Sequence, residues 1–125
     1  MPQRKTDVEA YVLSTDVQGI EALLSAALAC EVSLKFEPDV PWHYWANDAS
    51  RVVLQEAANH FTSVYVIGEF PWQSEPEFAR LLAAQLSCVV RCDPGAEYPL
   101  AGPCSFLEIN GDIEQLIEWQ DDEAQ

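Results

Sequence analysis

The side chains in this chain that most often carry nucleophilic or acid–base chemistry are two histidines and four cysteines. His43 or His60 could act as a base toward a thiol or an acid that the fold brings close, and Cys92 or Cys104 beside His60 is the pairing that would suit a hydrolase. Nothing in the sequence places either histidine next to a nucleophile. A lone histidine in a loop is usually an ordinary loop residue, so an enzymatic role is the minor alternative.

Carboxylate pairs and signature motifs also fail to name a reaction. Glu37 and Asp39 could do acid–base work of the glycosidase kind, but with 21 acidic residues some close pairs are expected by chance. The sequence contains no G-x-S-x-G, no Walker or G-x-G-x-x-G glycine loop, and no H-E-x-x-H or EF-hand spacing. We therefore expect a protein that acts by binding rather than by catalysis, without a metal ion or a cofactor.

The cysteine spacing favours thiols that pack as small apolar side chains. Zinc sites typically use C-x₂-C pairs, whereas Cys88 and Cys92 form a C-x₃-C pair. In a strand over 87–92 both would share a face with Val90, as buried free thiols do in a reducing compartment. A disulfide between Cys92 and Cys104 is the alternative.

Charge separates this sequence from that of an ordinary small domain. The chain has 21 acidic and 6 basic residues, a net charge of −15, and yet is 49% hydrophobic. No Lys or Arg follows Cys92. Solubility explains part of this surplus, but a small domain needs a net charge of only roughly two to eight. Such a surface disfavours nucleic acid and anionic membranes as partners, since a phosphate surface requires basic contacts, and it attracts a basic protein.

The segment FEPDVPWHYWAND, residues 36–48, combines acids, aromatic rings and prolines without any base. Large aromatic side chains are enriched at interface hot spots, so this segment is the predicted partner-binding region. The predicted contact residues are Glu37, Asp39, Trp42, Tyr44, Trp45 and Asp48, with Glu69 and Trp72 of the similar stretch EFPWQ as secondary contacts. The alternative is that Trp42 and Trp45 fold back onto the core while the acids only solvate a loop. The stretch EFPWQ carries the same choice.

Helices and strands must position these residues. Capping boxes at residues 15–18 and 74–77 predict two helices, each followed by apolar residues at helical spacing. Alternation or β-rich composition predicts strands over 8–14, 30–37, 62–69, 87–92 and 105–109. Residues 51–58 fit a strand or an Ala-rich helix. Asn110-Gly111 predicts a turn, after which a short helix over 112–119 is favoured over the second strand of a hairpin.

This order of elements predicts one α+β domain over residues 1–125. We expect a mostly antiparallel sheet with two main helices packed on one face, related to the ferredoxin-like sandwich but with extra C-terminal elements. No apolar stretch approaches the ~20 residues that cross a bilayer, and no apolar run follows the N-terminal bases. We therefore expect a cytoplasmic protein.

In size, charge and acidic-aromatic segments, the chain resembles the small bacterial immunity proteins that neutralise toxic nucleases, including those of contact-dependent inhibition systems. DNA-mimic inhibitors share these features. The resemblance implies tight, stoichiometric binding of a basic cognate toxin domain without catalysis. Two functions of other classes stay open. A small-molecule-binding or accessory domain would need a deep apolar pocket, and a hydrolase would need converging carboxylates or a Cys–His contact.

Overall fold

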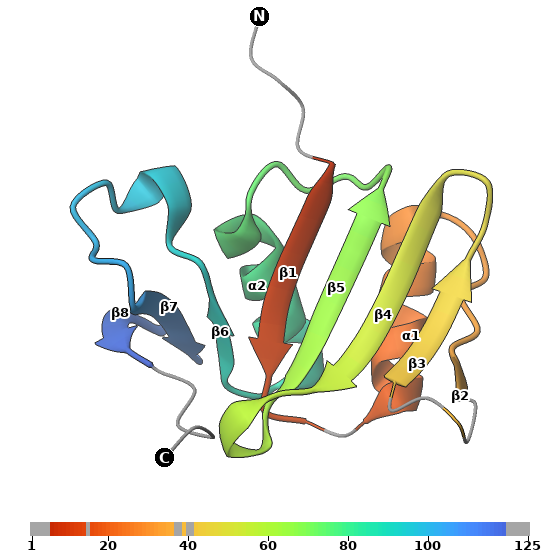
Figure 1. The fold of residues 1–125 in the computed structure, drawn as a ribbon, viewed down its shortest axis with the longest axis horizontal. Helices are drawn as coiled ribbons and strands as arrows, with labels where there is room; N and C mark the ends of the chain where they lie inside the picture. Colours follow the sequence, from red (N-terminus) through yellow and green to blue (C-terminus); the bar gives the residue numbers. More distant parts are fainter. Residues whose placement is uncertain (1–5, 15, 37–38, 40–41, 120–125) are drawn as a thin grey trace, which may run out of the picture.

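In the part of the chain that the structure describes, eight antiparallel strands form one sheet and two helices cover one of its faces (Figure 1). The structure is a computed structural model, and it describes residues 6–14, 16–36, 39 and 42–119. The elements in chain order are β1 (Asp7–Val12), α1 (Val17–Leu28), β2 (Lys35–Phe36), β3 (Trp42–Ala46), β4 (Ser50–Glu56), η1 (Ala58–His60), β5 (Thr62–Gly68), α2 (Glu75–Leu86), β6 (Val90–Cys92), η2 (Gly95–Glu97), β7 (Ser105–Asn110) and β8 (Ile113–Glu118). The fold class is α+β, as predicted, with the sheet as its dominant part.

The strand order β2-β3-β4-β5-β1-β6-β7-β8 places β1 near the middle of the sheet. β1 lies antiparallel between β5 and β6, and β4 pairs with the far side of β5. α1 follows β1, α2 connects β5 to β6, and both helices lie behind the sheet in Figure 1. Among the described residues, no helix is both long and apolar enough to cross a membrane.

Side-chain caps begin both helices. Asp16 caps α1, because its carboxylate accepts a hydrogen bond from the Gly19 backbone N–H at 2.9 Å. Thr15, the first residue of the predicted capping box, lies outside the described residues. Ser74 caps α2 by accepting from the Glu77 backbone N–H at 3.2 Å, as the S-x-x-E pattern predicts.

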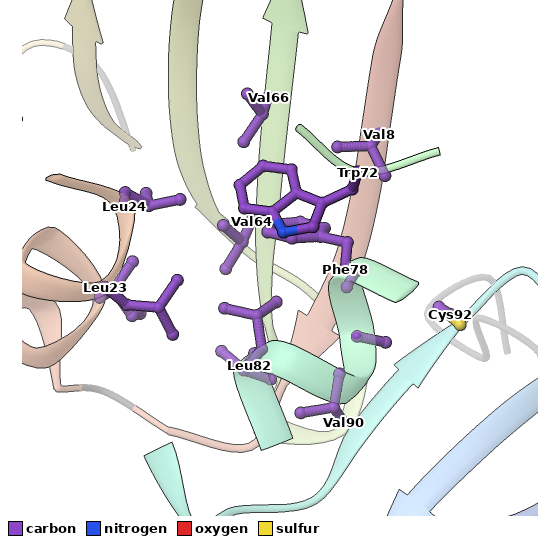
Figure 2. Packing of buried hydrophobic residues seen from close by; sticks show 14 of the residues in the cluster. Val8, Leu23, Leu24, Val64, Val66, Trp72, Phe78, Leu82, Val90 and Cys92 are labelled. Carbon is purple, nitrogen blue, oxygen red and sulfur yellow. The ribbon is translucent and has the colours of Figure 1, made fainter. Parts of the chain in front are cut away.

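The hydrophobic core lies between the helices and the sheet (Figure 2). Alternate residues of the central strands, among them Val8, Val64 and Val66, are fully buried on the helix side. Phe78 and Leu82 of α2 are fully buried opposite them. Since successive side chains of a strand point to opposite faces, the intervening residues lie on the other face of the sheet, which we call the helix-free face.

The expected strand over 30–37 is largely wrong, because only its last described residues form β2. Val32 and Leu34 are buried, as their alternation predicts. Their backbone N–H groups, however, donate to side chains of α1 rather than to another strand. Val32 N donates to Ser25 Oγ at 2.9 Å, and Leu34 N donates to Glu21 Oε2 at 2.6 Å.

The periodicity of residues 51–58 fits either a strand or a helix. In the structure they form most of β4 and the start of the 3₁₀ turn η1. β4 and β5 pair antiparallel on either side of that turn. β5 is central in the sheet, as its β-rich composition predicts.

The favoured helix over 112–119 is wrong, because β8 forms a hairpin with β7. Asn110 pairs with Ile113, so Gly111 and Asp112 are the central residues of the turn. Gly111 has a φ of 63°, which tight hairpin turns require and glycine adopts without strain. The Asn110-Gly111 turn prediction is confirmed, and the alternative of a hairpin partner is the correct one.

Candidate functional site

The predicted contact residues of β3 are divided between the two faces of the sheet. Residues directly opposite each other in paired strands share a face. Trp42 lies opposite Gln55, and Tyr44 opposite Val53, which places both aromatic side chains on the helix-free face. Trp45 lies on the helix side, where it packs against the core.

Trp72 belongs to the core. Its side chain is 6% exposed, and its ring centroid lies 4.3 Å from that of Phe78 (Figure 2). A partner would therefore contact little of the Trp72 indole. The structure supports the core interpretation for this residue.

Two of the predicted acidic contacts, Asp48 and Glu69, lie at the same end of the sheet, because Glu69 N donates a hydrogen bond to Ala49 O at 3.0 Å. Asp39, Asp48 and Glu69 are exposed, and Glu37 lies outside the described residues. β2 and β3 form one edge of the sheet, and β8 of the acidic C-terminal third forms the opposite edge (Figure 1). The two acidic regions of the sequence therefore do not adjoin.

The central strands present a different group of polar side chains on the helix-free face. Asp7, Glu9 and Tyr11 alternate with the buried residues of β1, and Ser63 and Tyr65 do the same in β5. Glu9 accepts hydrogen bonds from Ser63 Oγ at 2.5 Å and from Tyr11 Oη at 3.2 Å. Asp7 accepts one from Tyr65 Oη at 2.7 Å. Hydroxyl donors thus hold two carboxylates in fixed positions near the middle of the sheet.

An aromatic cluster adjoins these carboxylates. The Trp119 ring centroid lies 5.1 Å from those of Tyr11, Phe61 and Phe106, and the Tyr11 and Phe106 rings pack almost at right angles to it. Edge-to-face packing of this kind is favourable beyond the area that it buries. Trp119 Nε1 also donates a hydrogen bond to Asn59 Oδ1 at 2.5 Å, so the indole has one orientation.

The turn between β4 and β5 supplies this anchor for the indole. Asn59 and His60 have φ values of 59° and 69°, a left-handed conformation that residues other than glycine rarely adopt. Ala57 N donates to Phe61 O at 2.8 Å and closes the turn. This backbone geometry allows the Asn59 amide to reach Trp119.

The carboxylate group and the aromatic cluster together enclose a pocket of about 310 Å³, which we call the Glu9 pocket. Its lining includes Glu9, Tyr11, Glu56, Ser63, Phe106 and Trp119. No Lys or Arg is among the described residues that line it. The pocket therefore offers negative charge, aromatic surface and hydroxyl groups to a ligand.

Arg91, on β6 beside Tyr11, lies close to this pocket. Its guanidinium carbon is 4.5 Å from the centroid of the Phe61 ring and 4.9 Å from that of Trp119. The same guanidinium forms an ion pair with Glu108 at 2.8 Å. The helix-free face thus already holds one arginine between aromatic rings and a carboxylate.

No protein-family model, curated protein or solved structure matches the chain. What the site can bind therefore follows from its own side chains.

Sequence reasoning missed the Glu9 pocket because no short segment of the chain contains it. Its members come from β1, β5, β7, the end of β4 and the residue after β8. One local pattern does point to it: β1 alternates charged or aromatic residues with apolar ones, and such alternation marks a strand with one buried and one open face.

The environment of Tyr11 gives a test of this geometry. Burial, and then the negative charge of Glu9 and the hydrogen bond to it, raise the pKa of Tyr11 from 10.0 to about 12. Because the folded state favours the neutral phenol, this contribution to stability is present below pH 10 and is lost as the pH rises through about 12.

We expect Glu9→Gln to lower the pKa of Tyr11, since the substitution removes the negative charge and leaves the burial. An absorbance titration of phenolate formation in the folded protein measures it. Tyr65 is expected to shift less, because a hydrogen bond to Asp7 is the main cause that raises its pKa to about 12 and the charge of Glu9 is the smallest. An unchanged titration of Tyr11 in the variant would show that Glu9 does not contact it.

The thiol chemistry considered above has little support at Cys92. Cys30, Cys88 and Cys92 are free thiols, so the alternative of a disulfide between Cys92 and Cys104 is wrong. Burial, with the nearby charges of Glu75 and Asp93, raises the pKa of Cys92 to about 12, so its thiol stays protonated at neutral pH. Among the described residues, no group of three or more His, Cys, Asp or Glu side chains is arranged to hold a metal ion.

Proposed function

We propose that this protein is a stoichiometric inhibitor or immunity protein that binds a basic partner, most simply a toxin domain, in the cytoplasm. The helix-free face of the sheet is the surface that contacts the partner. The observation that carries the proposal is the Glu9 pocket, where ordered carboxylates and aromatic rings meet on a face that no helix among the described residues covers. The protein acts by occupying the partner's surface and not by catalysis.

Two properties of the chain support this function together. The net charge of −15 creates a long-range field that attracts a basic protein and speeds its encounter. Aromatic side chains supply the contact area once the partner arrives, because they bury large surfaces at small entropic cost. Trp42 and Tyr44 extend this aromatic surface toward one edge of the sheet.

The proposed contact surface belongs to an architecture that keeps it open. We infer that β1, α1, β4, β5, α2 and β6 form a ferredoxin-like unit, because the strand order β4-β5-β1-β6 with a helix after β1 and after β5 is the arrangement that such a unit requires. β2–β3 and β7–β8 widen its sheet at both edges. Both helices pack on one face, so the opposite face is free for a partner.

The salt dependence of association tests the proposed function. The immobilised protein is used to isolate partners from the organism that produces it, and the association rate of the isolated partner is then measured as ionic strength increases. We expect a basic partner whose association slows by about tenfold or more between low and high salt. An acidic partner, or a rate that does not change with salt, would contradict the proposal.

A second pocket favours the alternative of small-molecule binding. It has a volume of about 380 Å³ and lies on the helix side, between α1 and the edge of the sheet. Its lining includes Val17, Ile20, Phe36, His43 and Leu54, so it is mainly apolar. Small-molecule sites typically have volumes of about 300–1,000 Å³ and apolar walls. Gln55 and Glu56, at the end of β4, line both this pocket and the Glu9 pocket.

A further inference from the structure

The Glu9 pocket has the size of a site for one side chain. Its volume of about 310 Å³ is at the lower end of the range for small-molecule sites. It is bounded by the strands β1 and β5, by the turn after β4, and by Phe106 and Trp119. A flat protein surface would not fill this hollow, whereas a single projecting side chain would.

The carboxylate of Glu9 has acceptor capacity left for a ligand. Ser63 and Tyr11 each donate to a different oxygen of it. An ionised carboxylate has about four lone-pair positions, so each oxygen can accept a further hydrogen bond. Glu56 also lines the pocket, but it lies opposite Thr62, and this register places its side chain on the helix side of the sheet, so Glu9 is the carboxylate that the pocket offers. The pocket therefore suits a ligand that donates several hydrogen bonds and carries positive charge.

The aromatic walls narrow the choice of cation. Rings of Tyr11, Phe106 and Trp119 line one side of the pocket. A guanidinium group is planar, stacks on aromatic faces and binds a carboxylate through two parallel hydrogen bonds, whereas an ammonium group is a strongly hydrated point charge. A carboxylate next to aromatic rings therefore favours arginine over lysine.

Arg91 is an internal example of the same recognition. Its guanidinium lies over Phe61 and Trp119 and is paired with Glu108. Because Glu108 balances the charge of Arg91, the carboxylate of Glu9 remains for an incoming cation. Trp119 contributes to both places, since it also lines the Glu9 pocket.

We propose that the Glu9 pocket binds the guanidinium group of an arginine side chain presented by the basic partner. That a partner protein supplies this arginine rests on the proposed function. That the pocket binds a guanidinium group does not depend on the proposed function, and it can be measured on the protein alone.

The experiment titrates the full chain with N-acetyl-arginine amide and follows the indole N–H resonance of Trp119. We expect a saturable shift with a dissociation constant on the order of 1 mM. The citrulline analogue, which has the same shape without the charge, binds about tenfold more weakly or worse, and so does the lysine analogue.

Matched variants locate the binding to the pocket. Glu9→Gln weakens it by about tenfold, while Glu118→Gln, on the same sheet but on the helix side of β8, changes it by less than about twofold. Phe106→Leu is a second variant that removes a ring and keeps apolar bulk, and it also weakens binding. Melting curves establish that each variant is folded.

The inference is overturned if the Trp119 resonance does not shift, or if the citrulline or lysine analogue binds as tightly as the arginine analogue. It is also overturned if Glu118→Gln loses as much affinity as Glu9→Gln. If arginine does not bind in the pocket but a complex with a basic partner still forms, only the assignment of the pocket is wrong. Arginine binding without any basic partner would instead remove the proposed function alone.

Discussion

Replacing Trp72 with Ala is expected to lower the free energy of unfolding by about 3–5 kcal/mol. The indole is almost fully buried and packs on Phe78 (Figure 2). The ring of Phe70 also stacks on it, with a distance of 6.0 Å between the ring centroids. Removing it leaves a large cavity between α2 and the sheet that the neighbouring side chains cannot fill without moving. Chemical denaturation with urea measures the loss.

Trp42→Ala is the control for this prediction. Trp42 lies half-buried on β3, near the edge of the sheet and on its helix-free face. Its removal is expected to cost about 1 kcal/mol or less. If Trp72→Ala cost no more than Trp42→Ala, Trp72 would not belong to the core, and its role as a partner contact would return.

The second prediction with a large effect is a loss of about 100-fold in affinity for the basic partner on replacing Glu9 with Lys, or about 2.7 kcal/mol. The substitution replaces an ordered carboxylate in the middle of the proposed contact surface by an ammonium group. That group carries the same sign of charge as the basic partner and repels it. Ser63 and Tyr11 also lose the acceptor of their hydrogen bonds. Calorimetric titration with the isolated partner measures the change.

Glu118→Lys is the matched control, because it changes the net charge by the same amount. Glu118 is exposed in β8 and pairs with Ser105, two residues from the buried Leu107, so its side chain lies on the helix side of the sheet. A general attraction between an acidic and a basic protein predicts equal losses for both variants. A specific contact through the helix-free face predicts a much larger loss for Glu9→Lys.

The elements with strong local patterns could be predicted from the sequence. The α2 cap at Ser74 and the turn at Gly111 each depend on a few neighbouring residues, and the structure confirms both. The second strand of the hairpin could not be recognised, because β8 is an edge strand whose Ile113 and Leu116 are exposed. Without a buried face, the spacing of its apolar residues does not distinguish a strand from a helix.

The strand over 30–37 failed for a different reason. Its alternation correctly reported that Val32 and Leu34 are buried. Alternation records which side chains turn inward and not what the backbone binds, and here the backbone donates to Ser25 and Glu21 of α1.

A local concentration of acidic and aromatic residues did not locate the candidate site. Residues 36–48 attracted the prediction because acids and aromatic rings are concentrated there. Strand pairing divides that segment between two faces of the sheet, with Tyr44 on one and Trp45 on the other. It brings Glu9 and Trp119, which are distant in the sequence, into one pocket. Only the register of the paired strands contains this information.

The four tryptophans provide the most direct test of the central claim, that a basic partner binds the helix-free face. Their indole N–H resonances are recorded in the free protein and in the partner complex. The account predicts that Trp42 and Trp119 shift, because both lie on that face, while Trp45 and Trp72 on the helix side keep their positions. Shifts of Trp45 and Trp72 with Trp119 unchanged would contradict it.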